Sequence, residues 1–382
     1  LRSVACQIED LATPMEATGE MDSETPEPGH ALATRLARWR TDASGSWAPR
    51  AADDVRTYPF FSFAAWDQSK VDAVRARTNC STRGAPLECF TSADRYWWHP
   101  TVGHAPRMDQ RRFCAAMHHQ GVRRLLWAGD SIHLHWLASF LTQIDVRRFA
   151  YMLGLYDRAK EGGRNVSCPH GDVFIDCIRF GVQGSDTEAT WRDELIPGIA
   201  LADLVIMGLG NHYSMTSMKP NPRANVSGVE DVSMMWMRDV RALVDASVAT
   251  QSTKRTKFVW HTISPAHPNC QHYDLPLAAN ESFVSSEIEH WHHCKGCMAP
   301  AYGWEIFQSH NAFASRLFRS NGWDVLDTWE MDVLRPDAHT RFSNPPMRKP
   351  GSIQKQDCLH WSSPGLPDAW SALLIAALGK DS

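Results

Sequence analysis

The chain has 382 residues, of which 43% are hydrophobic and 21% charged, and its formal net charge is -4. This composition is typical of a globular protein and excludes a disordered chain, and the small charge gives no reason to expect nucleic acid or an anionic membrane as a partner. No apolar run approaches the roughly 18 residues that span a bilayer. Because the sequence starts at Leu1 rather than Met, we expect a fragment or processed form, with room for a membrane anchor or signal peptide upstream.

Cysteines and glycosylation motifs indicate the cellular compartment. The chain contains 10 cysteines, an even number that is compatible with a disulfide framework in an oxidising environment. The alternative is that several of them are small buried apolar residues of a reduced protein. N-glycosylation motifs begin at Asn79, Asn165, Asn225 and Asn280, more than the about two expected by chance. Together these features favour the secretory pathway.

The N-terminal part of the chain divides into two segments of different amino-acid composition. Residues 1–44 carry Pro, Thr, Ser, Gly and acidic residues with few apolar ones, which predicts a flexible stem. Residues 45–112 contain many aromatic residues and prolines, together with Cys80 and Cys89, but no clean helical or strand period. We expect them to form a small irregular Cys- and Trp-rich subdomain, held by its cysteines and packed rings.

Residues 113–382 show the alternation of an α/β domain. Short apolar runs that are typical of strands buried on both faces occur at 123–128, 149–155, 173–180, 203–210, 257–264 and 323–328. Helical patterns occur at 132–144, 232–248, 311–320 and 367–378. Strands that alternate with helices predict a mostly parallel sheet covered on both faces.

The first of these strands is followed at once by the tripeptide Gly129, Asp130 and Ser131. Ligands of an open α/β sheet sit outside the carboxyl ends of its strands, which is where we expect Ser131. Gly129 permits a tight turn that Asp130 supports, and the N-terminus of the next helix favours negative charge. The local pattern fits a nucleophilic serine whose amide stabilises an oxyanion, and it fits an ordinary Ser or Asp helix cap equally well.

A serine nucleophile needs a base, and the base needs an orienting group. Asp357 and His360 lie three positions apart just before the last predicted helix. The Asp357 carboxylate could hold one ring nitrogen of His360 and leave the other facing Ser131. An Asp-x-x-His pattern alone is more often a surface pair, so the stronger indication is the order of the blocks along the chain.

A third polar turn follows the predicted strand at 203–210. The Asn211 side chain could donate a hydrogen bond to an oxyanion there, and Gly208 could let the backbone approach closely. The alternative is a glycine-permitted turn in which Asn211 adopts a left-handed conformation.

These blocks together resemble the SGNH (GDSL-type) hydrolase superfamily, and in particular its PC-esterase branch, the trichome-birefringence-like polysaccharide O-acetyltransferases. The final block of that family reads Asp-Cys-x-His-Trp-Cys-x-Pro-Gly-x-Pro-Asp-x-Trp. This chain matches it at Asp357, Cys358, His360, Trp361, Pro364, Gly365, Pro367, Asp368 and Trp370. The segments at 261–267 and 326–339, and the motifs GSWAPR and YWWHP, are similar to further family segments.

The resemblance implies a three-layer SGNH-like domain that transfers acyl groups. It implies Ser131 as the nucleophile, His360 as the base and Asp357 as its orienting group, with oxyanion donors from Ser131, Gly208 or Asn211. The implied reaction moves an acetyl group from a donor co-substrate to a polysaccharide hydroxyl through an acetyl-serine, without cofactor or metal, in the Golgi lumen or outside the cell. A carbohydrate O-acetyl esterase with the same triad and a non-catalytic glycan-binding protein are the alternatives.

The chain also departs from the family pattern. Ser362 replaces the second cysteine of the final block, so we expect one family disulfide to be absent or rerouted. In the middle block Gly208 stands where the family has Asn, which leaves Asn211 displaced. The segment at 290–297 has His and Cys at metal-ligand spacing. For Cys294 and Cys297 we favour disulfide bonds over a metal site, one of them reaching Cys358 as the family pattern suggests.

Overall fold

The computed structural model describes the greater part of the predicted α/β domain and a short piece of the N-terminal region. The described residues are 45–49, 96–100, 107–144, 164–179, 191–213, 229–251, 256–267, 270, 273, 275–277, 304–339, 358–362 and 365–379. Several predictions lie outside them: the stem at 1–44, the cysteines Cys80 and Cys89, the strand at 149–155, the segment at 290–297, and Asp357.

A six-stranded sheet forms the centre of the molecule, with the strand order β4-β5-β3-β6-β7-β8. From β5 to β8 the neighbouring strands are parallel, and β4 pairs antiparallel with β5 at one edge. The mostly parallel sheet that the sequence predicts is therefore confirmed. The strands are β3 (Arg124–Gly129), β4 (Arg164–Val166), β5 (Val173–Arg179), β6 (Leu204–Gly208), β7 (Lys257–His261) and β8 (Asp324–Leu326).

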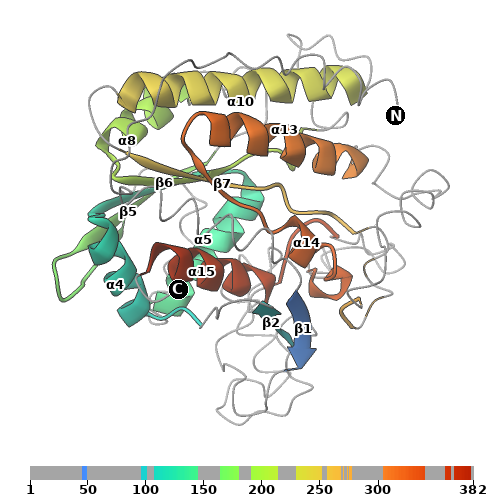
Figure 1. The fold of residues 1–382 in the computed structure, drawn as a ribbon, viewed down its shortest axis with the longest axis horizontal. Coiled ribbons are helices and arrows are strands. Elements are labelled where there is room, and N and C mark those ends of the chain that lie inside the picture. Colours follow the sequence, from blue (N-terminus) through green and yellow to red (C-terminus); the bar gives the residue numbers. More distant parts are fainter. Residues whose placement is uncertain are drawn as a thin grey trace, which may run out of the picture.

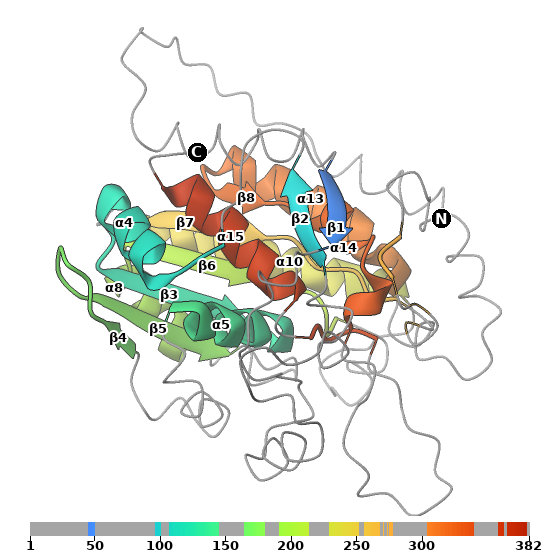
Figure 2. The same cartoon turned by 90° about the horizontal axis from the view of Figure 1, so that it is seen from below.

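Helices cover both faces of this sheet, which confirms the three-layer α/β/α architecture (Figures 1 and 2). One face carries α4 (Gln110–Gln120), α5 (Ser131–Ile144) and α15 (Leu366–Leu378). The other face carries α8 (Ile196–Leu201), α10 (Val229–Gln251) and α13 (Phe307–Ser320). Shorter turns complete the described chain: η6 (Trp191–Leu195), η8 (Trp304–Ile306), α14 (Trp329–Asp332) and η9 (Pro336–Ala338).

The winding of the sheet changes direction at β3. The next two strands of the described chain, β4 and β5, lie on one side of β3, with β5 directly beside it. The later strands β6, β7 and β8 lie on its other side, with β6 directly beside it. In an open α/β sheet such a switch point opens a crevice at the carboxyl ends of the strands. The loops after β3 and β6 therefore meet at this edge of the sheet.

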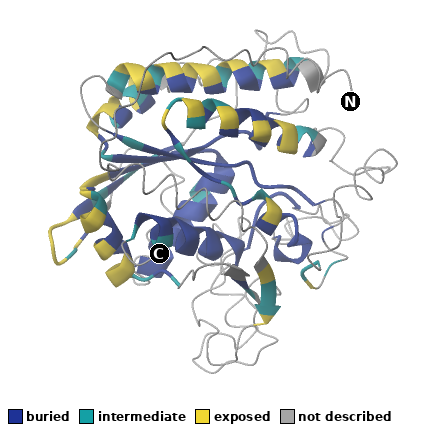
Figure 3. Ribbon diagram, in the orientation of Figure 1, coloured by how far each residue is buried: buried dark blue, intermediate teal, exposed yellow. Residues whose placement is uncertain are grey.

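Helices α5 and α15 are buried on almost every side, whereas α10 and α13 keep an exposed face (Figure 3). The two buried helices pack against each other beneath the sheet through aromatic and polar contacts. The rings of Trp136 and Trp370 meet edge to face at 5.7 Å, and Trp136 Nε1 donates to Ser371 Oγ at 3.0 Å. Ser139 Oγ donates to the buried Asp368 carboxylate. The final helix thus packs against the middle of α5.

The N-terminal region contributes a regular pair of strands where the sequence predicts irregular structure. Strand β1 (Gly45–Pro49) pairs antiparallel with β2 (Tyr96–Pro100). Trp47 fixes this pair to the domain: its Nε1 donates to the Met331 carbonyl at 3.1 Å, and the buried Arg335 guanidinium lies 4.1 Å from its ring centroid. The β-pairing is missed from sequence because each strand has only five residues and neither shows an alternation of apolar and polar residues.

Two disulfides lie within the described chain, Cys114–Cys168 and Cys270–Cys358. The expectation that Cys358 pairs with Cys294 or Cys297 is therefore wrong, because Cys270 occupies that position. Ser362 stands where the family pattern has a second cysteine, and its hydroxyl donates to the His339 carbonyl at 3.2 Å. Disulfides support the predicted oxidising compartment.

Helix α4 is the largest described element that the periodicity does not predict. Asp109 caps it by accepting the Arg112 N–H at 2.8 Å, and Gly121 ends it with φ 67°. Both signals are present in the sequence, but the polar and basic residues between them weaken the apolar stripe. The predicted boundary between residues 112 and 113 falls inside this helix, and the division into subdomains stays a prediction.

None of the helices in the described ranges is both long and apolar enough to cross a bilayer.

Candidate active site

Ser131 lies at the carboxyl end of the central strand β3 and is the first residue of helix α5. Its neighbour Asp130 caps the helix: Asp130 Oδ1 accepts the Ile132 N–H at 3.0 Å, and the Asp130 carbonyl accepts the Leu134 N–H at 3.1 Å. Because Asp130 satisfies these first-turn donors, the Ser131 hydroxyl is left for other partners. The helix cap that the tripeptide could supply is therefore Asp130, whereas Ser131 next to it is the candidate nucleophile.

Gly129 and Gly208 create the space behind this turn. They are register partners on β3 and β6, and the His133 ring packs against both. A Cβ on Gly208 would lie 1.9 Å from His133 Nε2, and a Cβ on Gly129 would lie 2.6 Å from the Gly208 carbonyl oxygen. Glycine is therefore required at both positions by close approach. The part of Gly208 in an oxyanion hole stays a prediction.

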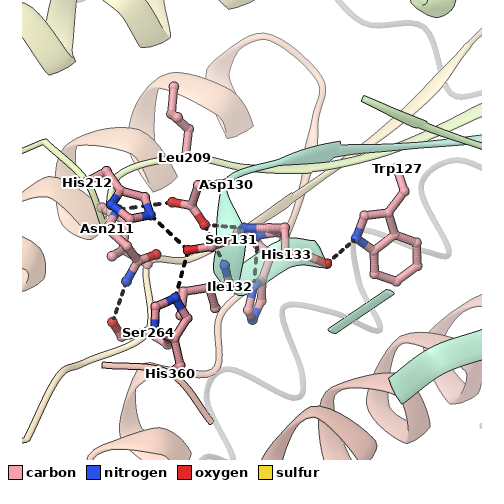
Figure 4. Close-up of polar contacts among 12 residues, drawn as sticks. Trp127, Asp130, Ser131, Ile132, His133, Leu209, Asn211, His212, Ser264 and His360 are labelled. Atoms are coloured by element: carbon pink, nitrogen blue, oxygen red, sulfur yellow. Dashed lines mark hydrogen bonds and ion pairs between the residues drawn. The ribbon is translucent and has the colours of Figure 1, made fainter. Parts of the chain in front are cut away.

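His360 reaches Ser131 from a segment more than 200 positions later in the chain, as Figure 4 shows. Its Nε2 lies 2.8 Å from Ser131 Oγ, and both residues are buried, with exposed fractions of 8% and 2%. A serine and an imidazole at this distance form the pair that nucleophilic catalysis requires. The predicted orienting group, Asp357, lies outside the described residues, so its role stays a prediction.

A second histidine, His212, contacts the same hydroxyl and is absent from the sequence prediction. Its Nε2 also lies 2.8 Å from Ser131 Oγ (Figure 4). His212 follows β6 directly after Asn211, so the same switch-point geometry that brings Asn211 to the site brings His212. The sequence feature that could have identified His212 is the polar turn after β6, in which the prediction names Asn211 and the glycines but not the histidine.

Asn211, the residue that the sequence singles out in this turn, is fully buried. Its backbone N–H donates to Asp130 Oδ2 at 3.2 Å, and its side-chain Nδ2 donates to the Ser264 carbonyl at 3.2 Å. Asn211 therefore joins the loop after β6 to the loops after β3 and β7. Its predicted donation to an oxyanion, and that of the Ser131 amide, stay predictions.

Asp130 is a buried carboxylate that remains ionised. Burial by itself would raise its pKa, but the hydrogen bond and charge of His133, the charge of His212 and the Ile132 N–H together lower its pKa well below the ordinary value. The carboxylate thus provides a fixed negative charge directly beneath the Ser131 turn.

A chain of buried polar groups leads from Asp130 into the core. His133 Nδ1 lies 3.5 Å from Asp130 Oδ1, and His133 Nε2 lies 3.2 Å from His261 Nδ1. His261 Nε2 lies 3.0 Å from Thr328 Oγ1, and the Thr328 hydroxyl donates to Asp332 Oδ2 at 2.8 Å. Each member has a polar neighbour, which is the condition under which a buried polar network stabilises a fold.

Two further members of this buried chain, His261 and Asp332, have shifted pKa values. Burial, together with the charge of His133, lowers the pKa of His261 far below its ordinary value, with Asp130 opposing. Burial raises the pKa of Asp332 well above its ordinary value, against the hydrogen bonds from Trp370 and Thr328. A neutral His261 accepts at Nδ1 and donates from Nε2 to Thr328, which matches the direction of the Thr328 hydrogen bond.

A second pair of histidines supports the loop that carries His360. His267 Nδ1 lies 2.6 Å from His339 Nε2, and His339 Nδ1 lies 3.1 Å from the His360 carbonyl oxygen. The His339 ring stacks on Trp361 at 3.8 Å. Cys358, two positions before His360, is bonded to Cys270, which lies just beyond His267. The two segments that the sequence singles out around 261–267 and 326–339 therefore build the support of His360.

No group of three His, Cys, Asp or Glu side chains in the described part of the chain could hold a metal ion. The candidate at 290–297 lies outside that part, and the metal alternative there is not tested.

Comparison with known proteins agrees with this geometry. Residues 190–377 match the model of the PC-esterase family, which is described as a GDSL/SGNH-like acyl-esterase family found in Pmr5 and Cas1p. This match covers just under half of the chain and supports its assignment to the PC-esterase family. The match includes the loop with His212 and the loop with His360, whereas Ser131 precedes it.

Individual relatives extend the PC-esterase similarity at low identity. The chain is 24% identical over 196 residues to the protein trichome birefringence-like 14 of Arabidopsis thaliana, covering 46% of this chain and 44% of the relative. It is 25% identical over 131 residues to xylan O-acetyltransferase 2 of Oryza sativa subsp. japonica, covering 32% and 25%. It thus spans less than half the length of these two relatives.

A longer PC-esterase match includes the serine. The chain is 21% identical over 341 residues to the protein trichome birefringence-like 43 of Arabidopsis thaliana, which covers 83% of this chain and 84% of the relative. The resemblance predicted from the motifs is therefore confirmed at the level of the family.

Proposed function

We propose that the chain is a serine acyltransferase that moves acetyl groups onto polysaccharide hydroxyls through an acetyl-Ser131 intermediate. The observation that carries the proposal is the 2.8 Å contact between Ser131 Oγ and His360 Nε2, made in a buried site at the switch point of the sheet. Family membership supports acyl chemistry, and the name of the rice relative, xylan O-acetyltransferase 2, supports acetyl as the group and a polysaccharide as the acceptor.

The first half-reaction acetylates the serine. His360 Nε2 takes the Ser131 hydroxyl proton as Oγ attacks the acetyl carbonyl, and the carbonyl electron pair moves onto oxygen. The N-terminus of α5, where the Ser131 amide lies, favours the negative charge of this oxyanion. When the intermediate collapses, the bond to the donor's leaving group breaks, and that group takes the proton from His360.

The second half-reaction transfers the acetyl group. A sugar hydroxyl attacks the acetyl-serine, and His360 removes its proton as the sugar oxygen bonds to the acetyl carbon. The bond to Ser131 Oγ then breaks, Oγ takes up a proton, and the serine hydroxyl and neutral His360 are restored. If water takes the place of the sugar, the same steps release acetate, which is the esterase alternative. No cofactor enters this scheme, and the acetyl donor is a co-substrate.

A donor-and-acceptor assay tests the proposal. The purified chain is incubated with an activated acetyl ester and a panel of unacetylated polysaccharides that includes xylan, and acetylated glycan and free acetate are both counted. We expect glycan acetylation to exceed acetate release and to vanish with Ser131→Ala. Ser320→Ala, which alters an exposed hydroxyl at the end of α13, is the matched control and should retain wild-type activity.

The assay separates the alternatives. Acetate without acetylated glycan would assign the esterase activity instead. The non-catalytic alternative predicts a third result. The chain would bind a glycan but form neither acetylated glycan nor acetate, and Ser131→Ala would not change the binding affinity. This result would contradict the proposal.

For the cellular compartment we propose the secretory pathway, with the Golgi lumen or the cell exterior as the place of action. The two disulfides support an oxidising compartment, and the exposed position of Asn165, the first residue of a sequon, supports N-glycosylation there. Expression in a eukaryotic cell with a signal peptide tests this assignment. We expect the chain in the secretory pathway to lose apparent mass when its N-glycans are removed enzymatically, and an unchanged mass would contradict glycosylation.

A further inference from the structure

The hydroxyl of Ser131 has two imidazole neighbours, one more than a serine and a single base require. His360 Nε2 and His212 Nε2 each lie 2.8 Å from Ser131 Oγ. A hydroxyl has one proton and donates to one acceptor. One imidazole therefore accepts the serine proton, and the other must carry its own proton and donate it to Oγ.

Asp130 identifies the donor. Its carboxylate and the His212 ring point toward one another beside Ser131 (Figure 4), and its Oδ2 also accepts the Asn211 N–H at 3.2 Å. The charge of His212 is one cause of the lowered Asp130 pKa. Because this attraction is mutual, the ionised carboxylate stabilises the protonated His212 ring. His212 therefore donates to Ser131 Oγ, and the serine proton points to His360.

We propose that His212 is a second catalytic residue, the general acid that protonates Ser131 Oγ when it leaves the acetyl group. The inference rests on the proposed acetyl-serine mechanism and divides its proton transfers between two histidines. His360 is the base for whichever hydroxyl attacks, and His212, held by Asp130, is the acid for the departing serine.

The steps balance over one turnover. In acylation His360 takes the Ser131 proton and gives it to the donor's leaving group, so His360 ends neutral and His212 stays protonated. In transfer the acceptor O–H bond breaks with its proton going to His360, the acceptor oxygen bonds to the acetyl carbon, and the carbon–Oγ bond breaks as His212 protonates Oγ. His360 then returns a proton to Oγ while the Ser131 hydroxyl passes its own to His212.

The position of the two rings fits this division. His360 is almost fully buried, with 8% exposed, whereas His212 is only partly buried. Since both ring nitrogens contact the same oxygen, the serine hydroxyl itself connects them for the final proton shift. A general acid of this kind typically contributes about 10²- to 10⁴-fold to the rate of the step it serves.

Separate measurement of the two half-reactions tests the inference. p-Nitrophenyl acetate is a suitable probe, because nitrophenolate leaves without needing a proton and reports acylation alone. His212→Gln keeps an N–H near Oγ but has no proton to release. We expect this variant to release the first nitrophenolate at nearly the wild-type rate, to turn over at least about 100-fold more slowly, and to accumulate acetyl on Ser131 in peptide mass spectra.

His360→Gln is the comparison variant and should lose the first release itself. His212→Asn serves as a second variant if His212→Gln unfolds at a lower temperature than the wild type. Wild-type turnover in a folded His212 variant would overturn the inference, and so would loss of the first release. A failure of the proposed function itself looks different: the wild-type chain would then never carry acetyl on Ser131.

Discussion

Asp130 and Ser131 are adjacent in sequence but have separate structural tasks. Asp130 caps helix α5 through the Ile132 N–H, and Ser131 contacts two histidines. A Gly-Asp-Ser pattern cannot reveal this division, because Ser and Asp are both good caps. The contact with His360 was predictable from the family-like final block, whereas His212 was not, since a single histidine after a strand carries no pattern of its own.

The glycine at 208 offers a test of packing at the single-residue scale. A methyl group there would collide with His133 Nε2, at 1.9 Å, and displace the ring that links Asp130 to His261. We expect Gly208→Ala to lower the free energy of unfolding by about 1–3 kcal/mol, the usual cost of overpacking. Denaturant titration of the purified variant measures this loss.

Gly198→Ala is the matched control for that substitution. Gly198 lies in α8, and a Cβ there would meet only side-chain methyl groups, with Ile178 Cδ1 nearest at 3.0 Å. The higher helix propensity of alanine should offset the small adjustment of these methyl groups, so we expect little change in the free energy of unfolding. Equal destabilisation by both substitutions would contradict the account of His133 and Gly208.

Among the structural elements, the strands were the easiest to predict. Strands β5, β6, β7 and β8 lie within apolar runs that the sequence marks, and β3 extends one residue beyond its run, because strands buried on both faces leave continuous apolar segments. Short or polar elements were missed: α4, α8, α14 and the β1–β2 pair have weak periodicity. The partner of Cys358 was also missed, since cysteine spacing alone does not determine connectivity.

The disulfide Cys270–Cys358 gives a test of how the loop with His360 is held. Both disulfides close long loops, with sequence separations of 54 for Cys114–Cys168 and 88 for this one. Loop entropy then predicts a similar loss of stability on removal of either, about 4 kcal/mol. Only Cys270–Cys358 lies next to His360, so replacing this pair by alanines should lower acetylation far more than replacing the other pair.

That comparison is made under conditions where both double variants stay folded, with activity corrected for the folded fraction. Equal activity losses in the two double variants would contradict the view that the disulfide positions His360.

At the scale of the whole molecule, several histidines are buried in neutral form far from solvent. Burial lowers the pKa of His267 to about 3 and that of His310 to about 3, from an ordinary value of 6.5. The unfolded chain therefore binds more protons than the folded chain between about pH 3 and 6.5, and stability rises with pH over this window. At higher pH this contribution is constant.

We expect the free energy of unfolding to fall steadily as the pH is lowered from 6.5, by about 1.4 kcal/mol per pH unit for each such histidine. His310 stacks on Trp236 at 4.2 Å and is remote from the serine, so His310→Phe keeps a stacked ring without the titration. In this variant the free energy of unfolding should change less steeply with pH, by about 1.4 kcal/mol per pH unit, because one titrating histidine is removed. An unchanged slope between pH 4 and 6 would contradict a neutral buried His310.

The whole molecule brings the loops after β3 and β6 and the segment before α15 to one edge of a parallel sheet, and the central claim is that the acetyl group passes through Ser131 there. The most direct measurement is a pulse and chase: brief exposure to a labelled acetyl donor, removal of the donor, and addition of a polysaccharide acceptor. We predict label on the Ser131 peptide after the pulse and its transfer to the glycan during the chase. Glycan that becomes labelled while the Ser131 peptide never carries the label would contradict the account.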